Sequence, residues 1–138
     1  MAKKKTAPVS FASSKVKELR RNATLPAKFE RMLAGFPLDK MFKGKSVAIK
    51  IHVGGDIGFT TVHPLFIRML VDALKKAGGD PFITDGSGAM QFAKARGYTE
   101  EVLGAPLIAA AGISNNYAYT RKINYRTLKS VDLCGNIV

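Results

Sequence analysis

The stretch that decides the fold is Ser46-Val47-Ala48-Ile49-Lys50-Ile51-His52-Val53. Apolar residues, mostly β-branched, alternate along it with other residues, and this alternation predicts a β-strand. Downstream, apolar residues recur at helical spacing over residues 64–77, and Gly78 is expected to end that helix. Residues 81–85 then form a second short strand. A strand, a crossover helix and another strand make a β-α-β unit, which predicts neighbouring parallel strands.

Further elements are expected on both sides of this unit. Upstream, the sequence predicts a helix over 15–21, capped by Ser13 or Ser14, and a second helix from Thr24 to Gly35. Downstream it predicts helices over 89–96 and 100–103, a short strand near 106–109, and strands near 117–125 and 131–138. The predicted fold class is α/β, with a parallel sheet of three or more strands, flanking helices and a basic helical N-terminal extension. An antiparallel sheet is disfavoured because the segment between the first two strands offers no hairpin turn.

Composition excludes several classes of protein. The chain has 138 residues, of which 46% are hydrophobic and 23% charged, as in a soluble globular domain. No run approaches the ~18–20 apolar residues of a membrane-spanning helix, and no apolar signal core follows the lysine-rich start, so we expect a cytoplasmic protein. The single cysteine, Cys134, cannot form an internal disulfide or an all-cysteine zinc site, and we expect it to be a small buried side chain.

Positive charge is concentrated in the N-terminal part of the chain. The formal net charge is +12, and residues 1–50 hold 13 Lys and Arg against 3 acidic residues. We expect residues 1–12 to be a disordered basic arm and residues 13–138 to form a single α/β domain. This basic N-terminal part could be solvated surface, or it could contact the phosphates of a polyanion. The cations available for such contacts are Lys3, Lys4, Lys5, Lys15, Lys17, Arg20 and Arg21.

Two glycine-bearing loops follow the first two predicted strands. Ligands of open α/β sheets bind at this carboxyl edge of the strands. The first loop covers residues 54–63, longer than the ~2–6 residues usual for such a connection. It matches neither a dinucleotide fingerprint nor a P-loop, so a flexible connection and an anion site both remain open. The candidate ligand-binding residues of this loop are Gly54, Gly55, Asp56, Thr60 and Thr61.

Polar residues at the ends of both strands complete the candidate site. Asp85 is expected either to cap the next helix or to accept hydrogen bonds from ligand hydroxyls, and Ser87 lies in the same loop. Lys50 and His52 interrupt an apolar strand on one face, so they require solvent or partners. Lys50 is expected to pair with Asp85 or Asp56, or to anchor a ligand.

Two other groups of residues are weaker candidates. His52 and His63 could both line the cleft, but two histidines without a third ligand do not predict a metal site. Tyr117, Tyr119 and Tyr125 lie near Arg121, Lys122 and Arg126, as in surfaces that stack nucleic-acid bases. Cross-strand packing explains the same residues and is the favoured interpretation.

Several ordered segments carry a family resemblance. They are residues 46–54, Gly58-Phe59-Thr60-Thr61-Val62-His63-Pro64, residues 81–85, Arg96-Gly97-Tyr98 and Leu103-Gly104-Ala105-Pro106. From about Phe11 to its end the chain resembles the N-terminal part of the domain of unknown function 362 family. The resemblance implies an association with iron–sulfur proteins, because many members carry a cysteine cluster for a four-iron four-sulfur cofactor further along a longer chain. With one cysteine, this chain is expected to hold no such cofactor.

The resemblance also implies a missing second half, so we expect a fragment or a split subunit. An apolar strand over 131–138 with nothing to cover it predicts self-association or a partner carrying the missing half, which light scattering over protein concentration would detect. The sequence predicts that the domain binds an anionic small molecule at its glycine-rich loops, with no catalytic residue or metal ligand assigned. The alternative is a nucleic-acid or polyanion binding module that uses the basic N-terminal half; membrane binding is not expected.

Overall fold

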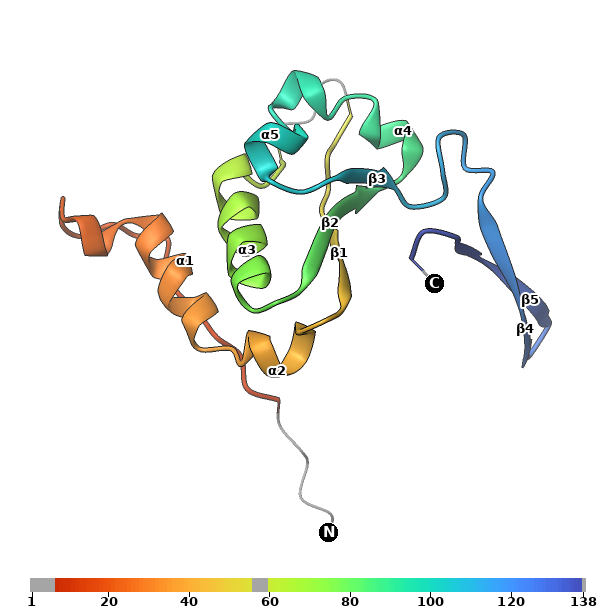
Figure 1. Cartoon of the computed structure of the whole chain (residues 1–138), viewed down its shortest axis with the longest axis horizontal. Coiled ribbons are helices and arrows are strands. Elements are labelled where there is room, and N and C mark those ends of the chain that lie inside the picture. Colours follow the sequence, from red (N-terminus) through yellow and green to blue (C-terminus); the bar gives the residue numbers. More distant parts are fainter. Residues whose placement is uncertain (1–6, 56–59, 138) are drawn as a thin grey trace, which may run out of the picture. The chain divides into compact units, whose positions relative to one another are not determined.

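The computed structural model describes residues 7–55 and 60–137 (Figure 1). The chain forms two compact units, Met1–Pro37 and Leu38–Val138. Residues 1–6 of the predicted N-terminal arm, and Asp56 of the predicted site, lie outside the described residues. Within the described residues, no helix is both long enough and apolar enough to cross a membrane.

The first unit contains one regular helix, α1 (Leu25–Ala34), preceded by the short 3-10 helix η1 (Arg21–Ala23). The predicted start of α1 is confirmed, because Thr24 Oγ1 accepts a hydrogen bond from the amide of Ala27 (3.4 Å). The helix predicted over 15–21 was wrong. Lys28 Nζ donates to the carbonyls of Ser13 and Lys15, which holds this segment against α1 in an irregular path. A short, highly charged segment gains too little from helix formation to offset the cost of nucleation.

The second unit contains a three-stranded parallel sheet in the order β1-β2-β3. Its strands are β1 (Ser46–Lys50), β2 (Asp80–Asp85) and β3 (Leu107–Ala109), and their order confirms the predicted α/β fold. The helices of this unit are α2 (Leu38–Phe42), α3 (Pro64–Lys76), α4 (Ser87–Met90), η2 (Lys94–Arg96) and α5 (Glu100–Leu103).

Strand β1 ends three residues earlier than its sequence pattern predicts. The amide of Ile51 still bonds to the carbonyl of Thr84 (3.2 Å). The next pairing is made by a side chain, because the amide of Val53 donates to the carboxylate of Asp85 (2.9 Å). Apolar alternation continues to Val53 because its side chain is buried in the core, although the backbone has left the sheet.

Helix α3 confirms the predicted crossover helix. His63 Nδ1 accepts a hydrogen bond from the amide of Leu65 (3.2 Å), so a histidine caps its first turn. Arg68 and Asp72 form the expected i,i+4 ion pair (3.0 Å). Beyond its end, Gly78 adopts a φ of +82°, a left-handed conformation that favours glycine.

The helix predicted over 89–96 is broken into two short pieces. After α4, the hydrogen bonds connect residues three apart, as in Ala93 to Met90 and Arg96 to Ala93. This tighter winding ends at Gly97, which has a φ of +77°. The break allows Ala93 and Tyr98 to enter the core together.

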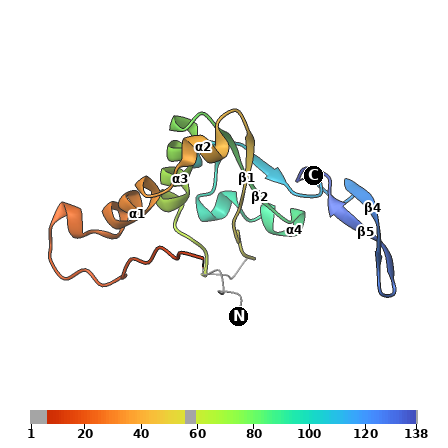
Figure 2. The same ribbon diagram turned by 90° about the horizontal axis from the view of Figure 1, so that it is seen from below.

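The core lies between α3 and one face of the parallel sheet (Figures 1 and 2). Apolar side chains from the sheet, α3, α5 and the segments that follow β1, flank η2 and follow α5 contribute to it: Ile49, Val53, Ile67, Val71, Leu74, Ile83, Ala93, Tyr98, Leu103 and Ala105. On the opposite face, Ala48 is exposed, Phe82 half-buried and Ile108 36% exposed, whereas Thr84, the partner of Ile108, is buried.

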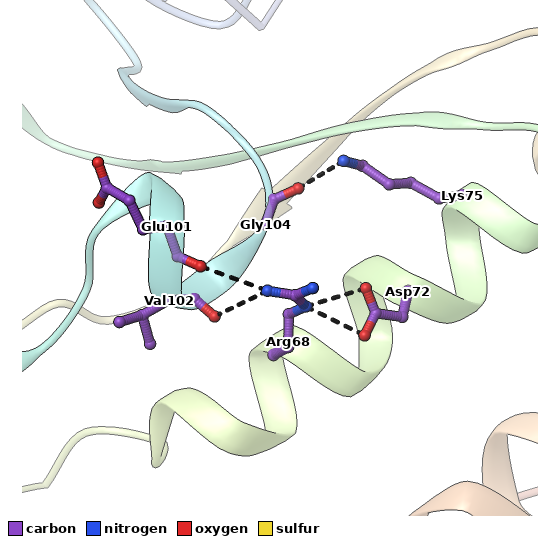
Figure 3. A network of polar contacts seen from close by, with 6 residues as sticks. All are labelled: Arg68, Asp72, Lys75, Glu101, Val102 and Gly104. Carbon is purple, nitrogen blue, oxygen red and sulfur yellow. Dashed lines mark hydrogen bonds and ion pairs between the residues drawn. The ribbon is translucent and has the colours of Figure 1, made fainter.

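Two cations of α3 hold the end of α5 (Figure 3). Arg68 Nη1 donates to the carbonyls of Glu101 (3.3 Å) and Val102 (3.4 Å), and Lys75 Nζ donates to the carbonyl of Gly104. The last carbonyls of a helix have no intrahelical partner and carry partial negative charge, so cations stabilise them. This network fixes the connection from α5 into β3.

The remaining strands form a separate antiparallel hairpin, β4 (Ala118–Tyr125) and β5 (Leu128–Cys134). Strand β5 therefore begins and ends earlier than the predicted strand over 131–138. It ends where the chain turns, and Asn136 there bonds through its amide to the carbonyl of Ala110 (3.0 Å). Cys134 is exposed, so its predicted burial was wrong. The apolar alternation of this segment is the same for a buried and an exposed strand, and the hairpin places Cys134 on a surface.

Candidate functional site

The carboxyl ends of β1 and β2 are joined by an ion pair between Lys50 and Asp85. Lys50 Nζ lies 2.8 Å from Asp85 Oδ1 and also donates to the carbonyl of Ile51 (2.7 Å). Asp85 is one of the two carboxylates that the sequence offers to Lys50. The Lys50 side chain is 62% exposed, and an ammonium group has three donors, so one N–H remains for solvent or a ligand.

Asp85 organises the backbone around this edge. Its Oδ2 accepts from the amide of Val53 (2.9 Å), and its Oδ1 also accepts from the amide of Gly86 (2.8 Å). Burial alone would raise the pKa of Asp85, but the hydrogen bonds from Lys50, Val53 and Gly86 and the charge of Lys50 together lower it below its ordinary value. Asp85 is therefore held as a carboxylate.

The predicted capping role of Asp85 differs from what is observed. Helix α4 begins after Gly86 and has no side-chain cap among the described residues. The aspartate oxygens are occupied by the amide of Val53, by Lys50 and by the amide of Gly86. Asp85 thus ties two strand ends together, a role that depends on long-range pairing.

Gly54 is the first residue of the first loop. It is buried and has a φ of +82°. A Cβ at this position would lie 3.0 Å from the Thr61 methyl group and 3.6 Å from the guanidinium carbon of Arg96. The start of the loop, its far end and η2 therefore converge on one point, which only glycine fits without strain.

The segment from Arg96 to Tyr98 covers the end of this loop. Gly97 approaches Pro64, since a Cβ on the glycine would lie 3.8 Å from the proline ring. The Tyr98 side chain is 2% exposed, and its hydroxyl donates to the carbonyl of Val62 (2.6 Å). A segment more than thirty residues downstream thus holds the end of the loop through contacts with Val62 and Pro64.

The other predicted site residues occupy varied positions. His52, Gly55 and Thr60 are exposed, and no described atom lies within 4 Å of a Cβ built on Gly55. Ser87 is half-buried and lines an open groove of about 640 Å³ between α4 and β3. Its neighbours in that groove include Gln91, Leu107, Ala109 and Asn115.

The described residues provide no metal-ligand cluster. Across 7–55 and 60–137, no three His, Cys, Asp or Glu side chains are grouped to hold a metal ion. One exposed cysteine on β5 does not fit the ligand set of a four-iron four-sulfur cluster, which requires several thiolates. We derive no redox chemistry from this chain.

Arg96 lies near the first loop, a position that the sequence pattern does not predict. Its guanidinium lies beside Gly54 and Thr61, yet it is separated from them by more than thirty positions. The Arg96-Gly97-Tyr98 segment carries part of the family resemblance, and its glycine marks a turn. The family resemblance and the glycine together mark this segment as a turn of interest. No periodicity in the sequence predicts that the turn lies against the first loop.

The comparisons with known proteins identify the family of this chain. Neither the curated proteins nor the solved structures contain a match. A family model, described as domain of unknown function (DUF362), matches residues 47–138, which include the sheet, the loop at Gly54 and the hairpin. The expected resemblance to this family is confirmed over these residues, and the chain belongs to the DUF362 family.

Proposed function

We propose that this domain binds a small oxyanion at the carboxyl edge of β1. We call the site formed by Lys50, Gly54, Thr61 and Arg96 the loop site. The observation that carries the proposal is the position of the Arg96 guanidinium beside the buried glycine of a long βα loop. Phosphate and carboxylate groups are the ligands that a guanidinium binds best, because its planar donors match two oxygens.

Arg96 supplies the main electrostatic attraction for an anion at the loop site. Lys50 is paired with Asp85 at 2.8 Å, so their charges largely cancel. Arg96 has no ion pair with any described residue, and its charge is uncompensated within that part of the chain. An oxyanion bound beside Gly54 would gain a charge-assisted contact from Arg96, and one that also reached Lys50 would gain a hydrogen bond from its remaining N–H.

Inorganic phosphate tests the proposal by calorimetry. We expect Arg96→Gln to weaken phosphate binding about 10- to 100-fold, the effect of removing hydrogen bonds to a charged group. Arg21→Gln is the matched control, because it removes the same charge from the basic N-terminal part of the chain. If Arg21→Gln weakened binding as much as Arg96→Gln, the polyanion hypothesis for the N-terminal half would replace the loop site.

Two glycine variants test the role of the loop backbone. Gly54→Ala forces a side chain into a left-handed conformation and against Thr61 and Arg96. We expect it to reduce phosphate affinity at least tenfold. Gly55→Ala has open space around its Cβ among the described residues and is expected to bind phosphate as the unmodified chain does. Equal affinity of both variants would contradict a site at Gly54.

A further inference from the structure

The hairpin of β4 and β5 has two chemically different faces. Directly opposed residues of an antiparallel pair share a face, and Tyr119 pairs with Leu133 while Arg121 pairs with Val131. Thr120 and Asp132 are opposed on the other face, where their side chains form a hydrogen bond (2.7 Å). We call the face of Tyr119 and Arg121 the tyrosine face.

The tyrosine face extends beyond the regular strands. The amide of Gly135 donates to the carbonyl of Tyr117 (2.9 Å), which continues the pairing by one step. A Cβ on Gly135 would lie 2.5 Å from the Tyr117 ring, so the ring lies directly over the glycine. Regular alternation along β5 places Lys129 on the same face as Val131. The tyrosine face therefore carries Tyr117, Tyr119, Arg121 and Lys129, with Val131 and Leu133 between them. The register shifts between Lys122 and Tyr125, so Ile123 is not assigned to this face.

These tyrosines are not core residues. Tyr117 is 55% exposed and Tyr119 is 56% exposed, and exposure at this level is compatible with packing across the hairpin. The Tyr117 ring lies over Gly135, and more than half of each tyrosine remains exposed. Two residues of a strand span about 7 Å, so the two rings form successive steps along one surface.

The charge on the tyrosine face is of one sign. Residues 117–137 contain Arg121, Lys122, Arg126 and Lys129, all exposed, and a single acidic residue. That acidic residue, Asp132, lies on the opposite face. In the described part of the hairpin, the tyrosine face thus combines exposed aromatic rings with cations and no carboxylate.

We propose that the tyrosine face binds single-stranded nucleic acid. Bases stack on Tyr117 and Tyr119, while Arg121 and Lys129 contact the phosphates of the same strand. Single-strand binding surfaces combine these two features, because every base offers a ring to stack and every linkage offers a charge. An acidic protein segment would use the cations alone, and the regular spacing of flat rings favours a ligand that is itself a series of rings.

The chain carries its own probe for this interaction. It has 4 tyrosines and no tryptophan, and Tyr98 is buried, so the other three, all in the hairpin region, are exposed reporters. We expect a thymidine oligonucleotide of about 12 nucleotides to quench tyrosine fluorescence in a saturable manner. Inorganic polyphosphate, which has the charge without the bases, is expected to leave the fluorescence unchanged. Equal quenching by polyphosphate would overturn the proposal in favour of general polyanion binding.

Substitutions on the two faces of the hairpin distinguish binding at the tyrosine face from a general effect of net charge. We expect Lys129→Gln to weaken oligonucleotide binding, measured by anisotropy, and to reduce its log-log salt slope by about 0.7. Lys122→Gln makes the same change on the opposite face and is expected to have a smaller effect. Tyr119→Leu keeps an apolar side chain at that position and is expected to weaken binding about 5- to 150-fold. Equal effects of the two lysine variants, or no effect of Tyr119→Leu, would contradict the proposal.

Two further comparisons test which kind of polyanion binds and whether its binding is confined to the tyrosine face. We expect duplex DNA and vesicles of anionic lipid to bind more weakly than the single strand, because neither offers unpaired bases for stacking. Stronger binding to either would overturn the assignment. Lys76→Gln, which removes an exposed charge of α3 outside both proposed surfaces, is expected to leave oligonucleotide binding unchanged.

Discussion

Replacement of Tyr98 by alanine is expected to lower the free energy of unfolding by about 3–5 kcal/mol, the usual cost of removing a large ring from a packed core. The Tyr98 side chain is 2% exposed and belongs to the same core cluster as Ile83 and Leu103. A domain of this size is stable by only about 5–15 kcal/mol, so most of its stability would be lost. Urea denaturation followed by circular dichroism measures the change.

A second substitution at Tyr98 separates packing from loop anchoring. Tyr98→Phe keeps the ring and removes only the hydrogen bond to the Val62 carbonyl. We expect a loss of about 1 kcal/mol in unfolding free energy, together with weaker phosphate binding, because the end of the loop is released. Tyr119→Ala on the exposed hairpin serves as the control and is expected to change stability by less than about 0.5 kcal/mol. A Tyr98→Ala variant as stable as Tyr119→Ala would show that the core is assigned wrongly.

The second large effect is expected at Asp85. Asp85→Ala leaves the amide of Val53 without its partner and leaves Lys50 unpaired. We expect a loss of about 2–3 kcal/mol in unfolding free energy, since the hydrogen bonds are made to a charged group but Lys50 can still reach solvent. The matched control is Asp72→Ala, which removes a surface ion pair with Arg68 and is expected to cost less than about 1 kcal/mol.

The contribution of Asp85 should also depend on pH. Its pKa is lower in the folded chain than in the unfolded chain, so the unfolded chain binds more protons in acid. The stabilisation is therefore fully present above the unfolded pKa of about 4 and is lost as the pH falls through the folded pKa. Urea midpoints of the unmodified chain and Asp85→Ala should converge in this acid range. A constant difference down to the lowest pH would contradict the role of the charge.

The sequence predicted the parts of the fold that depend on local pattern. The alternation around Ile49 and the helical spacing within α3 identify the β-α-β unit, and Gly78 marks the end of its helix. The helix predicted over 15–21 was wrong because a spacing that permits a helix does not supply the packing that stabilises one. The break between α4 and η2 depends on contacts of Ala93 and Tyr98 with the core, which no local pattern records.

The candidate site was predictable only in part, for a similar reason. The position of the glycine loop after β1 follows from the parallel topology, and so does the proximity of Lys50 to Asp85. The approach of Arg96 to Gly54 does not, because it depends on how η2 folds back over the loop. Exposure of Tyr119 and Cys134 is likewise a tertiary property: an apolar alternation is the same whether the strand enters a core or a hairpin on the surface.

The binding of an oxyanion at the loop site is tested most directly by nuclear magnetic resonance. Inorganic phosphate would be titrated into the full chain while the backbone amide signals and the Arg96 side-chain Nε–H signal are followed. We predict saturable shifts confined to the signals of Gly54, Gly55, Thr61 and Arg96. Absence of shifts at these positions, or shifts restricted to the basic residues of the first unit, would contradict an oxyanion site at the carboxyl edge of β1.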